Sequence, residues 1–230
     1  MNYRCARSLL LVLAFLSALL LRADEPLLYL ADSAPDAVLI LPPPPPPDSA
    51  EQKAELETVR RAHTEASAAQ LTAAKADITM NVFSFAAVIG PWFTPANLPR
   101  TQALFQEVER ETRTVTNAVK EFYQRPRPYV VDATIVPLAP EKSFSFPSGH
   151  STRGTVYALV LADLLPEKRD ALLDAGREIG FHREVAGVHF PSDVYGGRTL
   201  GRAIAQALLK NARFQADLVA VRAELAQAPR

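Results

Sequence analysis

Apolar residues recur at helical spacing along most of the chain, and the pattern predicts a series of helices. Between residues 101 and 123 they fall three or four positions apart, which marks one buried helix face; they are Leu104, Val108, Val115, Val119 and Phe122. Residues 50–76 contain no glycine or proline, and the mainly apolar run 78–89 ends at Gly90. We expect a helix over each of these segments.

The second half of the chain continues the helical pattern. Residues 152–165 and 170–188 predict two further helices, and a last helical region runs from residue 192 to the end, with a break near Asn211. No segment shows the alternation of apolar and polar residues that marks a half-buried strand. We therefore expect an all-α fold, a compact helical domain of about six to seven helices.

The N-terminal residues predict export. Arg4 and Arg7 precede an apolar run over residues 9–21, and a short polar segment ends that run. This layout is typical of a secretory signal peptide over residues 1–23, so we expect cleavage near Ala23 and a periplasmic mature protein. The apolar run is short for a transmembrane span, and we expect no span after cleavage; an uncleaved anchor is the alternative.

A run of prolines then divides the chain. Residues 42–47 are all proline, and each proline ring fixes φ and removes a backbone donor, so the run is either polyproline II or irregular. We interpret residues 24–48 as a proline-rich arm packed on the body or on a neighbouring subunit, with a docking peptide for a partner domain as the alternative. Residues 49–230 are then the helical domain.

Composition and charge limit the classes of function. The chain has 25 lysines and arginines against 25 aspartates and glutamates, and this balance argues against a general binder of nucleic acid. Cys5, the single cysteine, lies in the predicted signal peptide, which leaves no disulfide and no cysteine-based metal site in the mature protein. The sequence also lacks a His-Glu-x-x-His pattern and a P-loop, so we expect no metal and no cofactor.

A predicted helix start in the middle of the chain reads FSFPSGHS, residues 144–151. Ser148 is a good N-cap, and Gly149 lets the backbone approach a ligand closely. The unpaired N–H groups of the first helical turn make an anion site, with His150 at its rim, able to give or take a proton. The alternative is a plain capped helix start with a structural histidine.

Two other stretches supply further charged groups. Lys120, Arg125 and Arg127 form a basic cluster at the end of a predicted helix, where prolines fix the backbone, and Lys120 and Arg127 are seven positions apart. Arg183 lies six residues before His189, and Asp193 lies four after it. A carboxylate close to an imidazole fixes its tautomer and supports the cation that forms later. Taken singly, a basic residue at a helix end or a lone His–Asp pair usually has an ordinary structural role.

Taken together, Lys-x6-Arg-Pro, Pro-Ser-Gly-His and Arg-x5-His-x3-Asp match the three-part signature of the type 2 phosphatidic acid phosphatase superfamily. That superfamily includes the bacterial class A non-specific acid phosphatases and the vanadium haloperoxidases. The chain resembles the class A acid phosphatases most, in its signal peptide, proline-rich arm, length and the HFPSDVYGG segment at residues 189–197. The resemblance implies a metal-independent acid phosphatase that hydrolyses small phosphate monoesters with broad specificity through a phosphohistidine intermediate.

The resemblance also implies roles for individual residues. The phosphate-binding groups would be Lys120, Arg127, Ser148, Gly149 and Arg183. His189 would be the nucleophile, Asp193 its orienting partner, and His150 the acid that protonates the leaving alcohol. One position departs from the family, which usually has serine before the arginine of the third block. This chain has His182 there, so the hydrogen bonding behind Arg183 is expected to differ.

Other functions stay open at this point. A vanadate-dependent haloperoxidase uses the same cradle for vanadate, although such enzymes are usually larger. A non-catalytic envelope protein would use the proline arm as its working part. The sequence does not fix the natural substrate, and it leaves a homodimer open.

Overall fold

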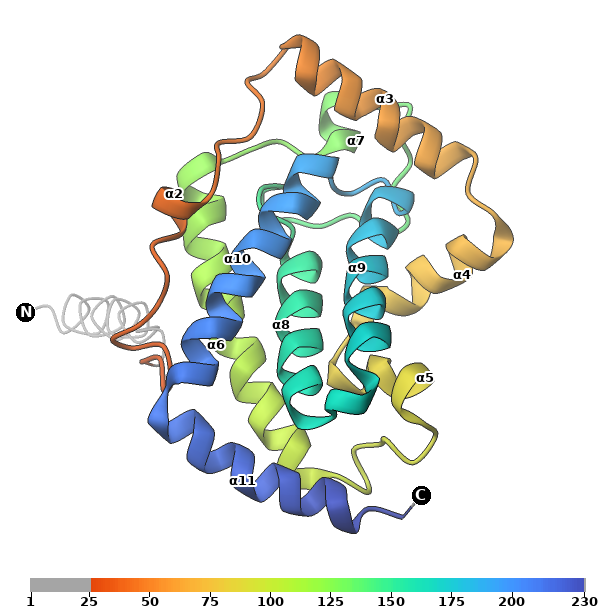
Figure 1. Cartoon of the computed structure of the whole chain (residues 1–230). Coiled ribbons are helices and arrows are strands. Elements are labelled where there is room, and N and C mark those ends of the chain that lie inside the picture. Colours follow the sequence, from red (N-terminus) through yellow and green to blue (C-terminus); the bar gives the residue numbers. More distant parts are fainter. Residues whose placement is uncertain (1–25, 230) are drawn as a thin grey trace, which may run out of the picture.

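The computed structural model describes residues 26–229, which form helices joined by turns and loops (Figure 1). No strand occurs in this part of the chain, which confirms the predicted all-α class. The helices of nine residues or more are α3 (Ala50–Thr64), α4 (Ala68–Ala76), α6 (Pro99–Tyr123), α8 (Gly149–Leu164), α9 (Arg169–Val185), α10 (Pro191–Lys210) and α11 (Ala212–Gln227). This set agrees with the predicted six to seven helices. The predicted signal peptide, residues 1–23, lies outside the described residues.

Helices α8, α9 and α10 form the centre of the molecule, with α8 packed against both of the others (Figure 1). Small residues let these helices approach closely. A Cβ atom added to Gly197 of α10 would lie 2.6 Å from the backbone oxygen of Ser148 and 3.1 Å from the backbone nitrogen of Thr152. Only glycine fits this contact. The close approach brings the first turn of α8 against the first two turns of α10, and it therefore fixes the spacing of the two motifs that lie at the starts of these helices.

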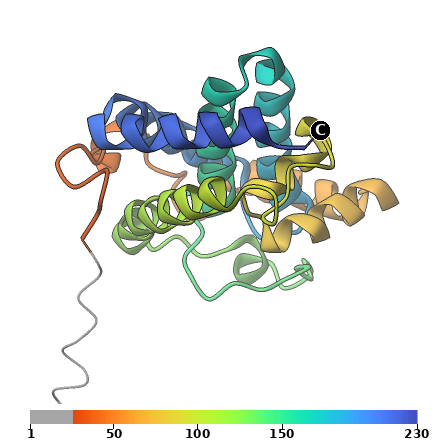
Figure 2. The same ribbon diagram turned by 90° about the horizontal axis from the view of Figure 1, so that it is seen from below.

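The long helix α6 flanks this centre and runs beside α11 (Figure 2). Four of its five predicted core residues are buried; they are Leu104, Val108, Val115 and Val119. The prediction for Phe122 is wrong, because its side chain is 62% exposed. In the last turn of α6 it is Tyr123 that faces the core, where its ring meets the buried Phe146 ring at 5.0 Å in an edge-to-face contact.

The single helix predicted over residues 50–76 is wrong, since the chain breaks between α3 and α4. Ser67 starts α4 with a capping box: its hydroxyl accepts from the Gln70 N–H at 3.2 Å, and the Gln70 side chain accepts from the Ser67 N–H at 2.8 Å. These two hydrogen bonds occupy the backbone N–H groups of Ser67 and Gln70, which would bond to carbonyl oxygens four residues earlier if α3 continued. A Ser-x-x-Gln pattern therefore ends one helix and begins another without glycine or proline.

The helix predicted over residues 78–89 is also wrong. The chain there forms two 3₁₀ turns and one short helix, which are Asp77–Thr79, Val82–Phe85 and α5 (Ala86–Ile89). Asn81 interrupts the helix because its side chain accepts from the Phe83 N–H at 2.8 Å and so starts a new turn. The predicted break near Asn211 is confirmed, and it has the same cause: the Asn211 side chain accepts from the Phe214 N–H at 2.9 Å and caps α11.

The N-terminal segment from residue 26 packs along the body and passes through the short helix α2 (Ala37–Ile40). The carboxylate of Glu111, fully buried in α6, accepts the backbone N–H groups of Leu28, Tyr29 and Leu30 at 2.7 to 2.9 Å. These three hydrogen bonds hold the segment against α6. Figure 1 shows it continuing past α10 toward α3.

Candidate active site

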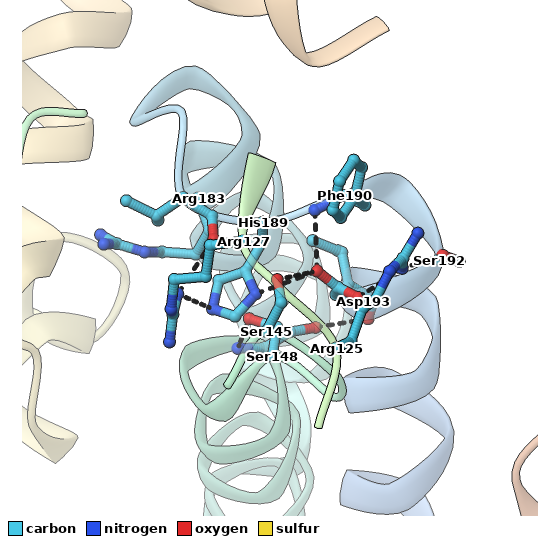
Figure 3. A network of polar contacts seen from close by, with 12 residues as sticks. Arg125, Arg127, Ser145, Ser148, Arg183, His189, Phe190, Ser192 and Asp193 are labelled. Carbon is cyan, nitrogen blue, oxygen red and sulfur yellow. Dashed lines mark hydrogen bonds and ion pairs between the residues drawn. The ribbon is translucent and has the colours of Figure 1, made fainter. Parts of the chain in front are cut away.

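His189 lies immediately before α10 and has no exposed surface. Its Nδ1 is 3.3 Å from Asp193 Oδ2, and its Nε2 is 3.2 Å from Nη1 of Arg127 (Figure 3). Pro191 begins α10, so Asp193 stands in the first turn, four residues after the histidine and on the same side of the chain. The two ring nitrogens thus face different groups, one a carboxylate and the other a cation.

The carboxylate of Asp193 is held from several sides and is fully buried. Its Oδ1 accepts from Arg125 at 2.6 Å, and its Oδ2 accepts from the Ser145 hydroxyl at 2.5 Å and from the Phe190 N–H at 2.9 Å (Figure 3). These donors leave the carboxylate little freedom to rotate. It can therefore fix the His189 ring with the proton on Nδ1 and with Nε2 free to react.

Cations lie on the Nε2 side of the imidazole. Arg127 is 2% exposed and donates to the backbone oxygens of Val188 at 2.9 Å and Ser143 at 2.8 Å, which fixes its guanidinium. Lys120, at 4% exposed, donates from Nζ to the backbone oxygens of Phe144 and Ser145. Burial, together with the charge of Arg127, lowers the pKa of Lys120 to about 7.

Arg183, near the end of α9, is the third cation and is 1% exposed. Its Nε and Nη1 atoms are buried and have no hydrogen-bond partner among the described residues. Buried donors without acceptors are rare in folded proteins because each one costs the free energy of its lost hydration. An anion with several oxygens, bound beside Arg127 and Arg183, would supply the acceptors.

The Pro-Ser-Gly-His stretch forms the other wall. Ser148 caps α8 as predicted, because its hydroxyl accepts from the Ser151 N–H at 3.3 Å. A Cβ atom on Gly149 would meet nothing within 4 Å, so the backbone there borders open space. His150 is 9% exposed, and its Nε2 lies 3.3 Å from the backbone oxygen of Ile78. A cavity of about 240 Å³ opens here and is lined by Arg113, Thr116, Asn117, Lys120, Glu141, Ser143, Gly149, His150 and Arg153.

Burial and neighbouring cations act on both histidines. The pKa of His189 is well below its ordinary value because of burial, with Arg127 and Lys120 adding to the effect and Glu141 opposing it. The pKa of His150 is also well below its ordinary value, because of burial and then the charges of Arg183 and Arg153. Both imidazoles are therefore biased toward the neutral form, the form in which a histidine nitrogen can act as a nucleophile.

Glu141 is a site residue that the sequence analysis does not identify. It lies in the loop before α8, and its Oε2 is 2.6 Å from Nη2 of Arg127. Its Oε1 is 3.6 Å from Nη2 of Arg183 and 3.9 Å from Nδ1 of His150. Burial alone would raise the pKa of Glu141, but the charges of His189 and the two arginines outweigh it and lower that pKa. The carboxylate thus lies against the same cations that would bind a phosphate.

Glu55 is a second residue that the sequence analysis does not identify, and it pairs with Arg125 of the predicted basic cluster. Arg125 pairs with two carboxylates: its Nη1 lies 2.6 Å from Asp193 Oδ1, and its Nη2 lies 2.9 Å from Oε2 of Glu55 on α3. The guanidinium also lies 4.0 Å from the centre of the Phe190 ring. Glu55 also accepts from the Ser192 N–H at 2.7 Å, at the start of α10. Helix α3 therefore positions the start of α10 and the Asp193 carboxylate.

His182, the residue that departs from the family pattern, is directed away from His189. Its Nδ1 is 2.6 Å from Oδ2 of Asp77, and its Nε2 is 3.8 Å from Glu178. The imidazole therefore joins α9 to the 3₁₀ turn that follows α4. The structure thus brings together the predicted residues of the three motifs and places His182 behind Arg183. Among residues 26–229, no group of three or more His, Cys, Asp or Glu is arranged to hold a metal ion.

Comparison with known proteins agrees with this arrangement. The PAP2 superfamily profile matches residues 112–216, a range that includes all three motifs. The chain is 34% identical over 147 residues to a non-specific acid phosphatase of Salmonella typhimurium, which covers 61% of this chain and 59% of that protein. It is 31% identical over 150 residues to a non-specific acid phosphatase of Providencia stuartii. This match covers 63% of the present chain and 60% of that protein. The chain thus spans about 60% of the length of these relatives.

A likeness in fold extends to a membrane-bound phosphatase. The solved structure of a transmembrane PAP2-type phosphatidylglycerolphosphate phosphatase from Bacillus subtilis superposes with a TM-score of 0.51 at 23% identity, and it covers 74% of this chain and 87% of that chain. None of the helices between residues 26 and 229 of the present chain has the length and apolar character needed to cross a bilayer. The helical fold, the three motifs and the profile match together show that residues 112–216 form a PAP2 superfamily domain.

Proposed function

We propose that this protein is an acid phosphatase that hydrolyses phosphate monoesters through a phosphohistidine formed on His189. The observation that carries the proposal is the orientation of that imidazole, with Nδ1 on Asp193 and Nε2 facing Arg127. The buried donors of Arg183 that find no acceptor between residues 26 and 229 add a place for the phosphate oxygens. The names of the acid phosphatase relatives support the same activity.

In the proposed first step, Lys120, Arg127, Arg183 and the N–H groups at the start of α8 hold the three non-bridging oxygens of the phosphate. Nε2 of His189 attacks phosphorus, a P–N bond forms, and the P–O bond to the alcohol breaks. The leaving oxygen takes the electron pair and receives a proton from His150, which must therefore be in its protonated form. The negative charge of the bound phosphate favours that form and opposes the lowering of the His150 pKa by burial. Negative charge in the transition state spreads over the three held oxygens, where fixed cations stabilise it without reorganisation.

In the proposed second step, water replaces the histidine. His150, now neutral, accepts a proton from the water as its oxygen attacks phosphorus, and the P–N bond breaks to release orthophosphate. Asp193 stabilises the imidazolium character of His189 while the intermediate exists. The group that protonates the leaving alcohol thus serves as the base for hydrolysis, as microscopic reversibility requires.

The cavity beside the cradle supports broad acceptance of monoesters. Its lining residues are polar or glycine, so they offer no apolar surface that would select one kind of alcohol. Export to the periplasm belongs to the same proposal, and it rests on the predicted signal peptide over residues 1–23 and on the bacterial relatives.

The activity is tested with p-nitrophenyl phosphate at mildly acid pH in excess EDTA. We expect turnover that EDTA does not reduce, because the proposed transition-state charges are carried by Lys120, Arg127 and Arg183. No turnover by the protein under these conditions, together with bromide or chloride oxidation after addition of vanadate, would replace the phosphatase by a haloperoxidase.

The value of kcat/KM should decline on the alkaline side for two reasons. His150 must carry the proton that it donates, and its pKa lies well below the ordinary value for histidine, while Lys120 has a pKa of about 7 and loses its charge as the pH rises through that value. The enzyme should stay active at mildly acid pH, because the lowered pKa of His189 keeps its Nε2 unprotonated there. A pH profile of the Lys120→Arg variant separates the causes, since arginine keeps its charge. The alkaline limb should become less steep in this variant, because only the loss of the His150 proton then remains, and an unchanged limb would show that the charge of Lys120 does not contribute to it.

Glu141→Gln should strengthen the binding of inorganic phosphate by about tenfold. The change keeps the shape of the side chain and removes the negative charge that lies against Arg127 and Arg183. The inhibition constant for orthophosphate, measured against p-nitrophenyl phosphate, is the readout. Glu51→Gln on the exposed face of α3 makes the same charge change away from the site and should leave the constant unchanged. A higher inhibition constant, that is, weaker phosphate binding, in Glu141→Gln would mean that the carboxylate supports the cradle instead of competing with phosphate.

A further inference from the structure

The cavity beside the cradle carries positive charge beyond the three phosphate-binding cations. Arg153 stands on α8, three residues after His150, and is therefore on the same face of the helix. Its side chain is 13% exposed and lines the cavity together with Arg113 of α6. The charge of Arg153 is among the causes that lower the pKa of both Lys120 and His150, which places the guanidinium near both groups.

These two arginines have only one acidic neighbour within ion-pair distance in the described part of the chain. Glu109 Oε1 is 3.9 Å from Nη1 of Arg113 and 3.9 Å from Nη1 of Arg153, and both distances exceed hydrogen-bond length. Two guanidinium groups thus share one carboxylate and retain an excess of positive charge. Their donors are better matched by an anion that accepts in-plane hydrogen bonds, such as a phosphate.

The position of the pair relative to His150 says which part of a substrate it would meet. His150 is the proposed donor to the leaving oxygen, so the group beyond that oxygen lies on the Arg153 side of the cavity. A neighbouring hollow of about 450 Å³ continues along α6, because Arg113 and Asn117 line both spaces. The site therefore has room for a leaving group larger than a simple alcohol, in a positively charged surrounding.

We propose that Arg113 and Arg153 form a second anion subsite, which favours substrates whose leaving group carries its own phosphate, namely diphosphates. The proposal rests on the phosphatase activity proposed above. For inorganic diphosphate, Nε2 of His189 attacks one phosphorus and the bond from that phosphorus to the bridging oxygen breaks. The bridging oxygen keeps the electron pair, receives the proton from His150 and departs as part of orthophosphate. Water then hydrolyses the phosphohistidine to a second orthophosphate.

The test compares kcat/KM for inorganic diphosphate with kcat/KM for p-nitrophenyl phosphate in the full mature chain. In Arg153→Gln the ratio of the two constants should fall at least about tenfold, because one partner of the second phosphate is lost while the cradle remains. Arg113→Gln should lower the ratio in the same direction, and its side chain is 61% exposed, so folding is not at risk. Arg202→Gln, an exposed arginine on α10, is the matched control and should keep the ratio.

A structural role for Arg153 would give a different result. If it only ties α8 to α6 through Glu109, both substrates lose activity together and the ratio stays constant, which would overturn the subsite. The inhibition constants of methylenediphosphonate and orthophosphate provide a readout without turnover of a diphosphate. In Arg153→Gln the inhibition constant of methylenediphosphonate should rise at least about tenfold more than that of orthophosphate. Equal changes in the two constants would again overturn the proposal.

The two proposals fail separately in these experiments. A chain that hydrolyses p-nitrophenyl phosphate with an unchanged ratio in both arginine variants keeps the phosphatase function and loses the subsite. A chain without any phosphatase turnover loses the proposed function. Direct calorimetric binding of methylenediphosphonate to the parent and to Arg153→Gln then still decides whether the second anion site exists.

Discussion

Replacing His189 by alanine is expected to lower kcat/KM for p-nitrophenyl phosphate by at least about 10³-fold. The variant removes the protein atom that bonds to phosphorus in the proposed mechanism, and binding by the cradle alone leaves a small residual rate. The imidazole is fully buried, so its loss also leaves a cavity beside Asp193. Steady-state kinetics at mildly acid pH, with thermal unfolding of both proteins, separates lost chemistry from lost folding.

His63→Ala is the matched control for this variant. His63 stands on α3, where its Nδ1 lies 2.8 Å from the backbone oxygen of Val185, and it contacts none of the cradle groups. Its removal should change kcat/KM by less than about threefold. A folded His189→Ala protein that keeps more than a tenth of the parent activity would rule out His189 as the nucleophile.

Asp193→Asn should lower kcat by about 10³- to 10⁴-fold. An effect of this order is found when the orienting carboxylate of a serine protease triad is neutralised. Asparagine nearly keeps the shape of the side chain. It can no longer hold the His189 ring with a proton on Nδ1 or stabilise the imidazolium. The substitution also removes one of the two carboxylates that pair with Arg125, at 2.6 Å, and this loss should lower the free energy of unfolding.

Glu55→Gln distinguishes these two consequences. It removes the other carboxylate partner of Arg125, at 2.9 Å, without touching His189. The free energy of unfolding should fall in both variants, whereas kcat should fall far more in Asp193→Asn. Equal losses of kcat at equal losses of stability would mean that Asp193 acts only by holding the fold together.

The parts of the site that the sequence predicts are those with local causes. Ser148 caps the helix that follows it, and Asp193 stands one helical turn after His189, so spacing along the chain is enough to place each pair. The order of helices follows in the same way from apolar periodicity and from breaks such as Asn211.

The parts that sequence reasoning misses depend on contacts between distant segments. Glu141 reaches the cradle because its loop is held by Tyr129, whose hydroxyl donates to the Glu141 backbone oxygen at 2.8 Å and accepts from the Glu141 N–H at 3.1 Å. Glu55 meets Arg125 across 70 positions of the chain. No periodicity or motif records such pairings. The exposure of Phe122 has the same origin, since helix spacing alone does not say where the core beneath α6 ends.

The most direct test of the account is to trap the intermediate on the full mature chain. A brief reaction with a phosphate monoester labelled at phosphorus is stopped with alkali, because phosphohistidine survives base and is lost in acid, and the labelled peptide is identified by mass spectrometry. We predict base-stable, acid-labile label on the peptide that contains His189, and none in His189→Ala. Label on another residue, or turnover by His189→Ala at the parent rate, would contradict it.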